Sequence, residues 1–501
     1  MTASHSANTG GLRPAPMQVP FTFAQQHGVL LDITAEPPRV LHRPGLTSAV
    51  LAELGRVLGG HYHLQLVSAA EFQQQLSAAF ARDNSEAMQV AEDLGADTNL
   101  ARLADDIPTT GDLMEGEDSA PVIRLINALI AQALRERASD IHIETYEDRL
   151  CVRFRTDGVL SEVLSPKRLL APLLVSRIKV MAKLDIAEKR LPQDGRIGVK
   201  LAGHALDIRV STLPAAHGER VVLRLLDKQS GQLTLGQLRM PPAVLSCYRE
   251  ALKIPHGIIL VTGPTGSGKT TTLYAGLMQI NDGQKNILTI EDPVEYTLPG
   301  VGQTQVNSKV GLNFASGLRS ILRQDPDVVM LGEIRDAETA RIAVQASLTG
   351  HLVLSTLHTN TAVGAITRLH DMGIEPFLLA SSLVAVLSQR LVRLLCSHCK
   401  QAYSPDAQER QLLGLSAQAA VLVYRPQGCS ECRHSGYQQR IGIYEAVRID
   451  AALRQLIHAG AGESELITAA RAQGDSLMQD GVRAVLAGET SLAEVLRVTT
   501  G

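Results

Sequence analysis

The stretch from Gly263 to Thr270 reads GPTGSGKT and directly follows the apolar run His256–Thr262. A short apolar strand, a glycine-rich loop ending in Lys-Thr and a helix together form a phosphate-binding P-loop. The glycines let backbone N–H groups turn toward an anion, Lys269 brings positive charge to the β- and γ-phosphates, and the Thr270 hydroxyl can ligate Mg²⁺. The pattern therefore predicts a site for a nucleoside triphosphate and Mg²⁺.

A second segment places a carboxylate at the end of another apolar run. Residues 327–331 read DVVML and are followed by Gly332 and Glu333. Because ligands of parallel sheets lie beyond the carboxyl ends of the strands, we expect Glu333 to activate water beside the γ-phosphate as the general base. Gly332 stands where the common P-loop pattern has a metal-binding aspartate, so Mg²⁺ would depend on Thr270, phosphate oxygens and water.

Two more segments are expected at the same sheet edge. The run 288–296 (LTIEDPVEY) ends in acids, of which Asp292 and Glu295 can orient water or metal; helix capping and solvated charge are the alternative, above all for Glu291. The run 350–357 precedes His358, a candidate sensor of the γ-phosphate, although a single histidine at a strand end is more often structural. Glu295 is the acid that competes with or assists Glu333.

Several arginines accompany these segments. Arg209 and Arg224 are charged positions on otherwise apolar strands ahead of the P-loop, and Arg319, Arg323 and Arg335 surround the acidic segments. An arginine supplied across a domain or subunit boundary can neutralise transition-state charge, which is worth about 10³–10⁵ in rate in other P-loop enzymes; inter-domain salt bridges are the alternative. The predicted catalytic residues are Glu333, Glu295, Lys269, His358, Arg209 and Arg224. The predicted nucleotide-binding residues are Gly263, Pro264, Thr265, Gly266, Ser267, Gly268, Lys269, Thr270, Thr271 and Asp292.

Four of the six cysteines form two Cys-x-x-Cys pairs, Cys396 with Cys399 and Cys429 with Cys432. Two such pairs can close a tetrahedral Zn²⁺ site, and four thiolates leave no open position for a substrate, so the predicted role is structural. His398 and His434 are competing ligands, and a pair of redox-active thiol motifs is the alternative.

The elements that must position these residues indicate an α/β protein of several domains. Apolar residues repeat at helical spacing after Ser119 and predict a helix of about 17 residues, followed by alternating runs typical of an antiparallel sheet. The predicted division is an N-terminal adaptor domain (1–82), an acidic linker (83–118), an α+β domain (119–229), an ATPase domain (230–395), a zinc-binding module (396–433) and a C-terminal helical subdomain (434–501). The adaptor carries no motif of its own that we can attach to chemistry.

Composition restricts the possible partners. A chain of 501 residues with 48 Lys+Arg, 51 Asp+Glu and a net charge of −3 has no global basic field, and 3% aromatic residues without Trp leave few platforms for stacking bases. Nucleic acid is therefore not an expected partner.

The longest apolar stretch, 377–387, falls short of the roughly 20 residues of a membrane-spanning helix, and the first 20 residues do not resemble a signal peptide. We expect a cytoplasmic protein that reaches the membrane through partners.

Taken together, these segments resemble the secretion ATPases of bacterial type II secretion and type IV pilus systems over about residues 119–501. The most specific pieces are SDIHIE (139–144), IAEKRLPQDGRI (186–197), TGPTGSGKTTTLY (262–274), IEDPVEY (290–296), LRQDPDVVMLGEIRD (322–336) and TGHLVLSTLHTN (349–360). Within the family the type II secretion branch is the most similar.

The resemblance implies a RecA-like P-loop core preceded by an α+β domain, with ATP bound between the two. It also implies a homo-hexameric ring that drives a pseudopilus through an inner-membrane platform protein, and an N-terminal domain that meets the cytoplasmic domain of an inner-membrane secretion protein. It maps the family's Asp box to Asp292 and Glu295, its atypical Walker B motif to Glu333 and its His box to His358, and it supports Zn²⁺ at the cysteines. A type IV pilus assembly motor is the nearest alternative, and a nucleic-acid translocase is a more distant one.

Overall fold

The computed structural model describes residues 119–201, 204–227, 233–416 and 418–500, together with residue 100 and short pieces between residues 24 and 75. The chain divides into two compact units, Met1–Lys228 and Gln229–Gly501. The predicted acidic linker, 83–118, lies outside the described residues apart from residue 100. Within the described ranges, no helix combines the length and the apolar character that crossing a membrane requires.

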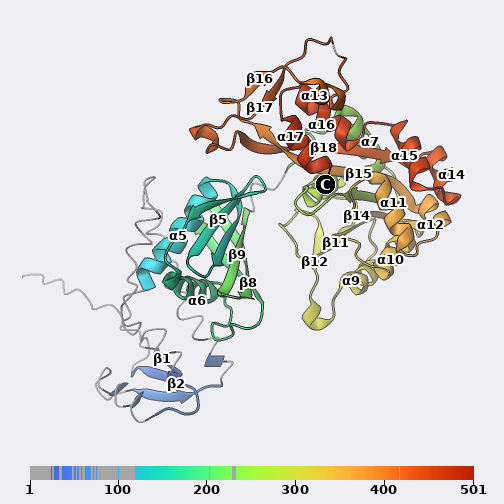
Figure 1. Cartoon of the computed structure of the whole chain (residues 1–501). Helices are drawn as coiled ribbons and strands as arrows, with labels where there is room; N and C mark the ends of the chain where they lie inside the picture. The colour runs from blue at the N-terminus through green and yellow to red at the C-terminus, as the bar shows by residue number, and fades with distance from the viewer. Residues whose placement is uncertain are drawn as a thin grey trace, which may run out of the picture. The chain divides into compact units, whose positions relative to one another are not determined.

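A small three-stranded sheet lies near the beginning of the first unit, within the predicted adaptor domain (Figure 1). Its strands are β1 (Val29–Asp32), β2 (Arg39–His42) and β3 (His63–Leu66). Strands β1 and β2 are antiparallel, whereas β2 and β3 are parallel. Val29 and Val40 pack with Val50 and Leu54 in a small apolar core.

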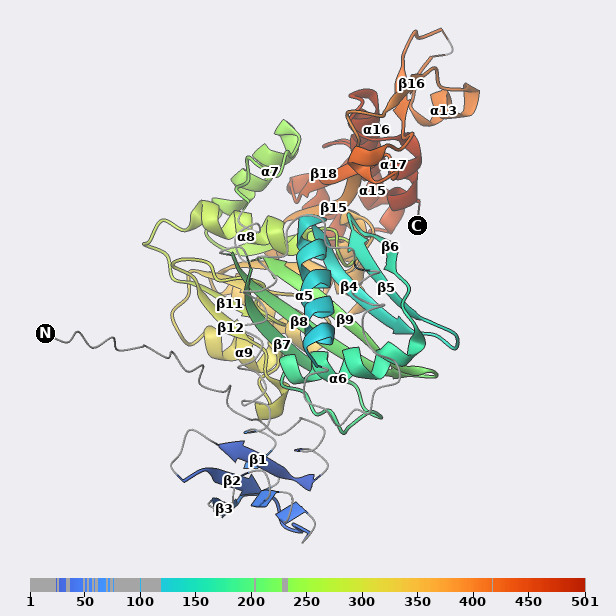
Figure 2. The same ribbon diagram turned by 90° about the vertical axis from the view of Figure 1, so that its left-hand side faces the viewer.

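Residues 119–227, as far as they are described, form a six-stranded antiparallel sheet in the order β6-β5-β4-β9-β8-β7, with helices α5 and α6 packed on one face (Figure 2). The predicted 17-residue helix is confirmed as α5, because Val122, Leu125, Ile126 and Leu129 share the buried face. The elements are α5 (Ser119–Arg135), β4 (Ala138–Thr145), β5 (Leu150–Thr156), β6 (Val159–Leu164), η1 (Arg168–Leu170), α6 (Ala171–Met181), β7 (Gln193–Leu201), β8 (His204–Ala215) and β9 (Gly218–Asp227).

The second unit is built on a seven-stranded sheet in the order β12-β11-β13-β14-β10-β15-β18, in which only β18 is antiparallel to its neighbour. Its strands are β10 (Gly257–Thr262), β11 (Ile287–Glu291), β12 (Gly302–Gln305), β13 (Val328–Leu331), β14 (Leu352–Leu357), β15 (Leu383–Leu395) and β18 (Tyr437–Arg448). Its flanking helices are α7 (Pro242–Leu252), α8 (Lys269–Ile280), α9 (Phe314–Ile321), α10 (Ala337–Leu348), α11 (Ala362–Asp371) and α12 (Pro376–Ser382), with η2 (Ser308–Val310) before α9.

Helices cover both faces of this sheet, and its central strands β10, β13 and β14 are buried along their whole length. In β10, Ile258 and Leu260 pack in the core that contains α10 and α11, whereas Ile259 and Val261 pack in the core that contains α7 and α8. A strand buried on both faces shows no alternation of polar and apolar residues. Because strands β10 to β15 are parallel, their carboxyl ends lie at one edge of the sheet.

The C-terminal part of the chain is not only helical. Strand β18 lies within the residues predicted as a C-terminal helical subdomain, yet it pairs with β15 and extends the central sheet. The other elements of this part are β16 (Gln401–Tyr403), α13 (Ala407–Leu412), β17 (Val423–Arg425), η3 (Ser430–Cys432), α14 (Ala451–His458), α15 (Glu463–Arg471), α16 (Leu477–Leu486) and α17 (Leu492–Thr499). Helices α16 and α17 pack with β15, β17 and β18 around a separate small core.

Candidate active site and metal centre

The predicted phosphate-binding loop connects the carboxyl end of β10 to the first turn of α8. Gly263, Gly266 and Gly268 have φ angles of 148°, 80° and 86°, a region that residues with a Cβ atom rarely adopt. At Gly263 a Cβ atom would lie 2.5 Å from the carbonyl oxygen of Gln389 in β15. The glycines therefore fix both the shape of the loop and its close packing against β15.

The loop and the start of α8 offer donors to an anion. No side chain caps the first turn of α8, where Thr270 and Thr271 are half-buried. The hydroxyl of Ser267 is buried and has no hydrogen-bond partner among the residues that the structure describes. Uncapped amides at a helix N-terminus favour phosphate. The residues present therefore fit a bound nucleotide, with the Thr270 hydroxyl available to Mg²⁺.

The side chain of Lys269 folds back over the loop. Its Nζ donates to the carbonyl oxygens of Gly263 at 2.8 Å and Pro264 at 3.1 Å. Burial lowers the pKa of Lys269 to about 8; the Glu333 carboxylate opposes this shift and the Arg390 charge adds to it. A phosphate that replaced the two neutral carbonyl acceptors would favour the charged form of Lys269.

Glu333 lies just beyond β13 and meets His358, which lies just beyond the adjacent strand β14. Its Oε2 is 2.9 Å from Nε2 of His358, and its Oε1 is paired with Arg335. Arg335 also approaches Asp292, beyond β11, with 3.7 Å between Nη2 and Oδ2. The hydroxyl of Thr356 fixes the backbone of this segment by donating to the carbonyl oxygen of Gly332 at 2.7 Å. The structure thus brings the predicted Glu333, His358 and Asp292 to one sheet edge.

The acids that follow β11 differ in their environment. Glu291 is buried and accepts hydrogen bonds from the hydroxyls of Tyr274 and Thr289 and from the side-chain amide of Gln303, the last at 3.1 Å. Asp292, whose side chain is 40% exposed, is available to a ligand or to water. Glu291 therefore holds α8 and β12 against β11. Because it is buried and bonds to these side chains, it is neither the helix cap nor the solvated charge that was the alternative for it. Glu295 is half-buried, and its backbone N–H donates to the Tyr274 hydroxyl at 3.4 Å.

The segment that carries His358 is tied to the strand before the phosphate-binding loop. The hydroxyl of Thr262, at the end of β10, accepts from the backbone N–H of Thr359 at 3.1 Å and donates to its carbonyl oxygen at 2.9 Å. Both bonds join the end of β10 to the segment that follows β14, its parallel neighbour in the sheet. The loop and the histidine are therefore fixed relative to each other by one buried hydroxyl.

Arg209 and Arg224 belong to the first unit, where they lie opposite each other on β8 and β9. The Nε atom of Arg224 donates to Oδ1 of Asp140 at 2.8 Å, an ion pair within the sheet. Arg209 is half-buried beside it. Their assignment as catalytic residues stays a prediction.

Sequence reasoning missed Gln389, which supports the loop from β15. Its side-chain N–H donates to the carbonyl oxygen of Ser267 at 2.6 Å, and its Oε1 accepts from the Thr272 hydroxyl at 2.8 Å. The available signal was the polar sequence Ser388-Gln389-Arg390, which directly follows the apolar stretch 377–387. These residues instead continue β15, and all three are buried.

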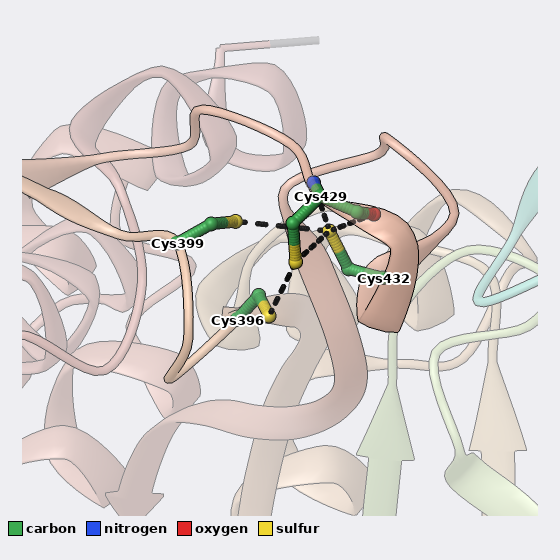
Figure 3. Close-up of side chains that lie close together, drawn as sticks. All are labelled: Cys396, Cys399, Cys429 and Cys432. Atoms are coloured by element: carbon green, nitrogen blue, oxygen red, sulfur yellow. Dashed lines mark hydrogen bonds between the residues drawn. The ribbon is translucent and has the colours of Figure 1, made fainter.

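The four predicted zinc ligands lie together, their sulfurs pointing toward one another (Figure 3). All four Sγ atoms lie within 4.8 Å of one another, and the distances are 3.9 Å for Cys396–Cys429, 3.7 Å for Cys399–Cys432 and 3.7 Å for Cys429–Cys432. These distances are too long for disulfides, which are about 2.05 Å. Among the described residues, the cluster includes neither of the histidines considered as competing ligands.

The geometry of the cysteine cluster fits Zn²⁺. A tetrahedral ion with Zn–S bonds of about 2.3 Å separates its sulfurs by about 3.8 Å. Backbone N–H groups also point at the sulfurs: Gly428 donates to Cys399 at 3.3 Å, and Cys429 and Gly436 each donate to Cys432 at 3.2 Å. Burial opposes ionisation of both Cys432 and Cys399: the two N–H donors and the neighbouring thiols lower the pKa of Cys432, whereas burial raises the pKa of Cys399. The backbone N–H groups would stabilise thiolates at a bound metal ion.

Comparison with known sequences identifies two families along the chain. The model of the family described as Type II/IV secretion system protein matches residues 115–497. The model of a domain described as part of GSPII protein E matches residues 18–80. The second match covers the region in which our sequence analysis found no informative motif.

Individual relatives agree with these matches. Type II secretion system protein E of Pseudomonas aeruginosa is 60% identical over 484 residues, 97% of this chain and 96% of that protein. Type II secretion system ATPase E of Vibrio cholerae is 54% identical over 490 residues, 97% of each chain. Among solved structures, the pilus retraction motor PilT with bound ADP superposes with a TM-score of 0.51 at 27% identity, covering 74% of this chain and 96% of PilT. The predicted resemblance to general secretion pathway protein E and the predicted RecA-like core are confirmed, and the chain belongs to the type II/IV secretion system protein family.

Proposed function

We propose that this protein hydrolyses ATP as the motor of a type II secretion system, powering pseudopilus assembly and export of folded proteins across the outer membrane. The observation that carries the proposal is the meeting of Glu333, His358 and Asp292 at the strand ends beside the phosphate-binding loop. Family membership supports the same activity, because relatives of 52–60% identity are named for type II secretion.

The side chains divide the chemistry among them. Lys269 and the amides at the start of α8 bind the phosphates, and bound Mg²⁺, held by the Thr270 hydroxyl, would neutralise charge on the β- and γ-phosphate oxygens. Glu333 accepts a proton from the attacking water, and the hydrogen bond from His358 orients its carboxylate. Glu295 remains the competing or assisting acid.

Phosphate release by the purified full-length protein tests this assignment. Glu333→Gln should bind a fluorescent ATP analogue with an affinity within about threefold of the parent, while turnover falls by at least about 10². Glu295→Gln is the matched control from the same sheet edge. If Glu333→Gln hydrolyses ATP at the parental rate while Glu295→Gln does not, the two acids must exchange roles. Absence of hydrolysis by the parent, alone and assembled, would reject the enzyme.

Arg209 and Arg224 are proposed to act on nucleotide in the assembled protein rather than in a single chain. Their support is the placement of two cations side by side on β8 and β9, with Arg224 54% exposed. Substituting each by Gln should lower turnover only under conditions where the chain assembles, and Arg155→Gln, at the same Asp140, is the control. Equal loss of turnover in the variants of Arg209, Arg224 and Arg155 would indicate that disruption of the ion pairs with Asp140, rather than of a contact with nucleotide, causes the loss.

We propose that the chain works as a homo-hexamer in the cytoplasm, attached to the inner membrane through partners. Residues 1–82 would bind the cytoplasmic domain of an inner-membrane secretion protein, and the ring would act on an inner-membrane platform protein. The match of residues 18–80 to a domain of GSPII protein E supports the first contact. Co-sedimentation with membranes that contain the secretion partners should be lost when residues 1–82 are deleted, whereas ATP binding should persist.

The cysteine cluster is proposed to hold one structural Zn²⁺. Four buried or half-buried thiols leave no position for a substrate, which supports a role in folding rather than in catalysis.

A type IV pilus assembly motor is the second candidate, since the chain also shares its fold with a motor of the pilus, the retraction motor PilT, at 27% identity. A gene deletion in the source organism distinguishes the two candidates. Deleting the gene should abolish secretion and leave pili intact if the first is right, and should do the reverse if the second is right.

A further inference from the structure

Arg390, in β15, is a buried arginine whose hydrogen bonds all go to neutral groups. It is 5% exposed, and its Nη2 donates to the backbone oxygen and the Oδ1 of Asn360 at 3.2 and 3.0 Å. Its Nη1 donates to the carbonyl oxygen of Gln389 and its Nε to that of Val498, both at 3.2 Å. Among the described residues, no carboxylate forms an ion pair with it. An ion buried without a counter-charge is costly, and the cost falls when an anion binds nearby.

The guanidinium of Arg390 lies directly behind the phosphate-binding loop. A Cβ atom on Gly263 would lie 3.2 Å from its Nη1. The Arg390 charge is also close enough to contribute to the lowered pKa of Lys269. Two cations therefore lie near one short glycine-rich segment, and a polyphosphate in the loop would relieve their repulsion.

The contacts of Arg390 also connect the loop to the C-terminal helix. Asn360 follows Thr359, which is hydrogen-bonded to the end of β10, and Val498 lies in the last turn of α17. Helix α17 is held on β15 independently of Arg390, since Arg393 pairs with Glu494 at 2.7 Å. Arg390 is thus the point at which α17, the His358 segment and the phosphate-binding loop come together.

We propose that Arg390 is a positioning residue of the nucleotide site: the bound polyphosphate balances its buried charge, and its bonds couple α17 to the phosphate-binding loop. This inference rests on the proposed ATP site. It predicts that removing the charge weakens binding in proportion to the charge of the ligand. A merely structural role would weaken the binding of all nucleotides alike.

The test measures Kd values of the full-length protein for ATP, in its non-hydrolysable form, and for ADP and AMP, with Mg²⁺ present. Arg390→Gln should weaken binding of the ATP analogue about tenfold, of ADP less, and of AMP by no more than about twofold. Arg390→Lys should stay within about threefold of the parent for all three. Arg393→Gln is the matched control, because it loosens α17 but removes a charge that Glu494 already balances; its three affinities should change together or not at all.

The contribution of α17 is tested by ending the chain after Arg497, which removes the Val498 acceptor and keeps the Arg497–Glu494 pair. This truncation should weaken binding of the ATP analogue in the parent but have no further effect in Arg390→Gln. Additive effects, or equal weakening of all three nucleotides by Arg390→Gln, would overturn the inference. If Arg390→Gln does not fold, Arg390→Lys provides the test. Because lysine keeps the positive charge, a loss of affinity above threefold for only the ATP analogue and ADP would contradict the inference. A parent that binds no nucleotide would instead refute the proposed ATP site.

Discussion

The phosphate-binding site and the cysteine cluster lie in the same unit but are built in opposite ways. Around the first, Asp292, Arg335 and His358 are 40%, 58% and 48% exposed, and their polar contacts join groups from different strands. In the second, the described contacts of the four thiols are with one another, with backbone N–H groups and with the carbonyl oxygen of Cys429, and three of the thiols are buried. An exposed sheet edge allows a ligand to bind and dissociate, whereas a buried shell of four thiols would retain a metal ion.

Strand β15 connects the two sites. Gln389 and Arg390 lie under the phosphate-binding loop, and the same strand ends at Leu395, immediately before Cys396. The backbone N–H of Leu395 donates to the carbonyl oxygen of Glu489 at 2.8 Å, which fixes the end of the strand near the last helices. The comparison therefore predicts that substitutions in the cysteine cluster affect the fold, and that substitutions at the phosphate-binding site affect nucleotide binding and turnover.

The largest effect is expected in the cysteine cluster. Cys396→Ser should abolish binding of one Zn²⁺ per chain and unfold the module, because metal binding in such sites contributes roughly 10–16 kcal/mol of apparent folding free energy. Metal analysis and thermal unfolding measure this. Cys247→Ser, at a half-buried thiol outside the cluster, is the control and should leave both readings unchanged. Full zinc occupancy in Cys396→Ser would mean that the four cysteines are not the ligands.

A smaller, pH-dependent effect on nucleotide affinity is expected at the phosphate-binding site. Because burial lowers the pKa of Lys269 to about 8 in the free protein and a bound phosphate raises it, binding takes up a proton above that pH. Nucleotide affinity should therefore fall as pH rises through 8 and be about tenfold weaker at pH 9 than at pH 7. Lys269→Arg, which stays charged, should lose this dependence. A flat profile in the parent, or the same slope in Lys269→Arg, would remove Lys269 as the titrating group.

Both candidate sites could be predicted from the sequence because each has a local signature. GPTGSGKT and the two Cys-x-x-Cys pairs indicate nucleotide and metal binding by their spacing along the chain, and the positions of Glu333 and His358 at one sheet edge followed from the rule that parallel strands end at one edge. The structure brings these last two to 2.9 Å of each other from β13 and β14.

What sequence reasoning missed depends on which strands become neighbours. Gln389 and Arg390 matter because β15 pairs with β10, and β18 joins the sheet because it pairs with β15. Such pairings join residues far apart in sequence, so periodicity within one segment does not show them. The pairing of Arg335 with Glu333 is close in sequence, but it requires the turn after β13, which no pattern specified.

The smallest effect is expected from Thr262, whose hydroxyl ties the loop to the His358 segment. Thr262→Val keeps the shape but leaves the half-buried N–H and carbonyl oxygen of Thr359 without this partner, at a cost of about 1–3 kcal/mol. We expect unchanged zinc content, nucleotide affinity within about threefold and a turnover about fivefold lower, because His358 is less well fixed relative to Glu333. Ser347→Ala is the control, since Ser347 is equally buried but its hydroxyl donates to the carbonyl oxygen of Val344 within α10. Equal loss of turnover in both variants would show that general stability, rather than the alignment of His358 with the loop, limits the reaction.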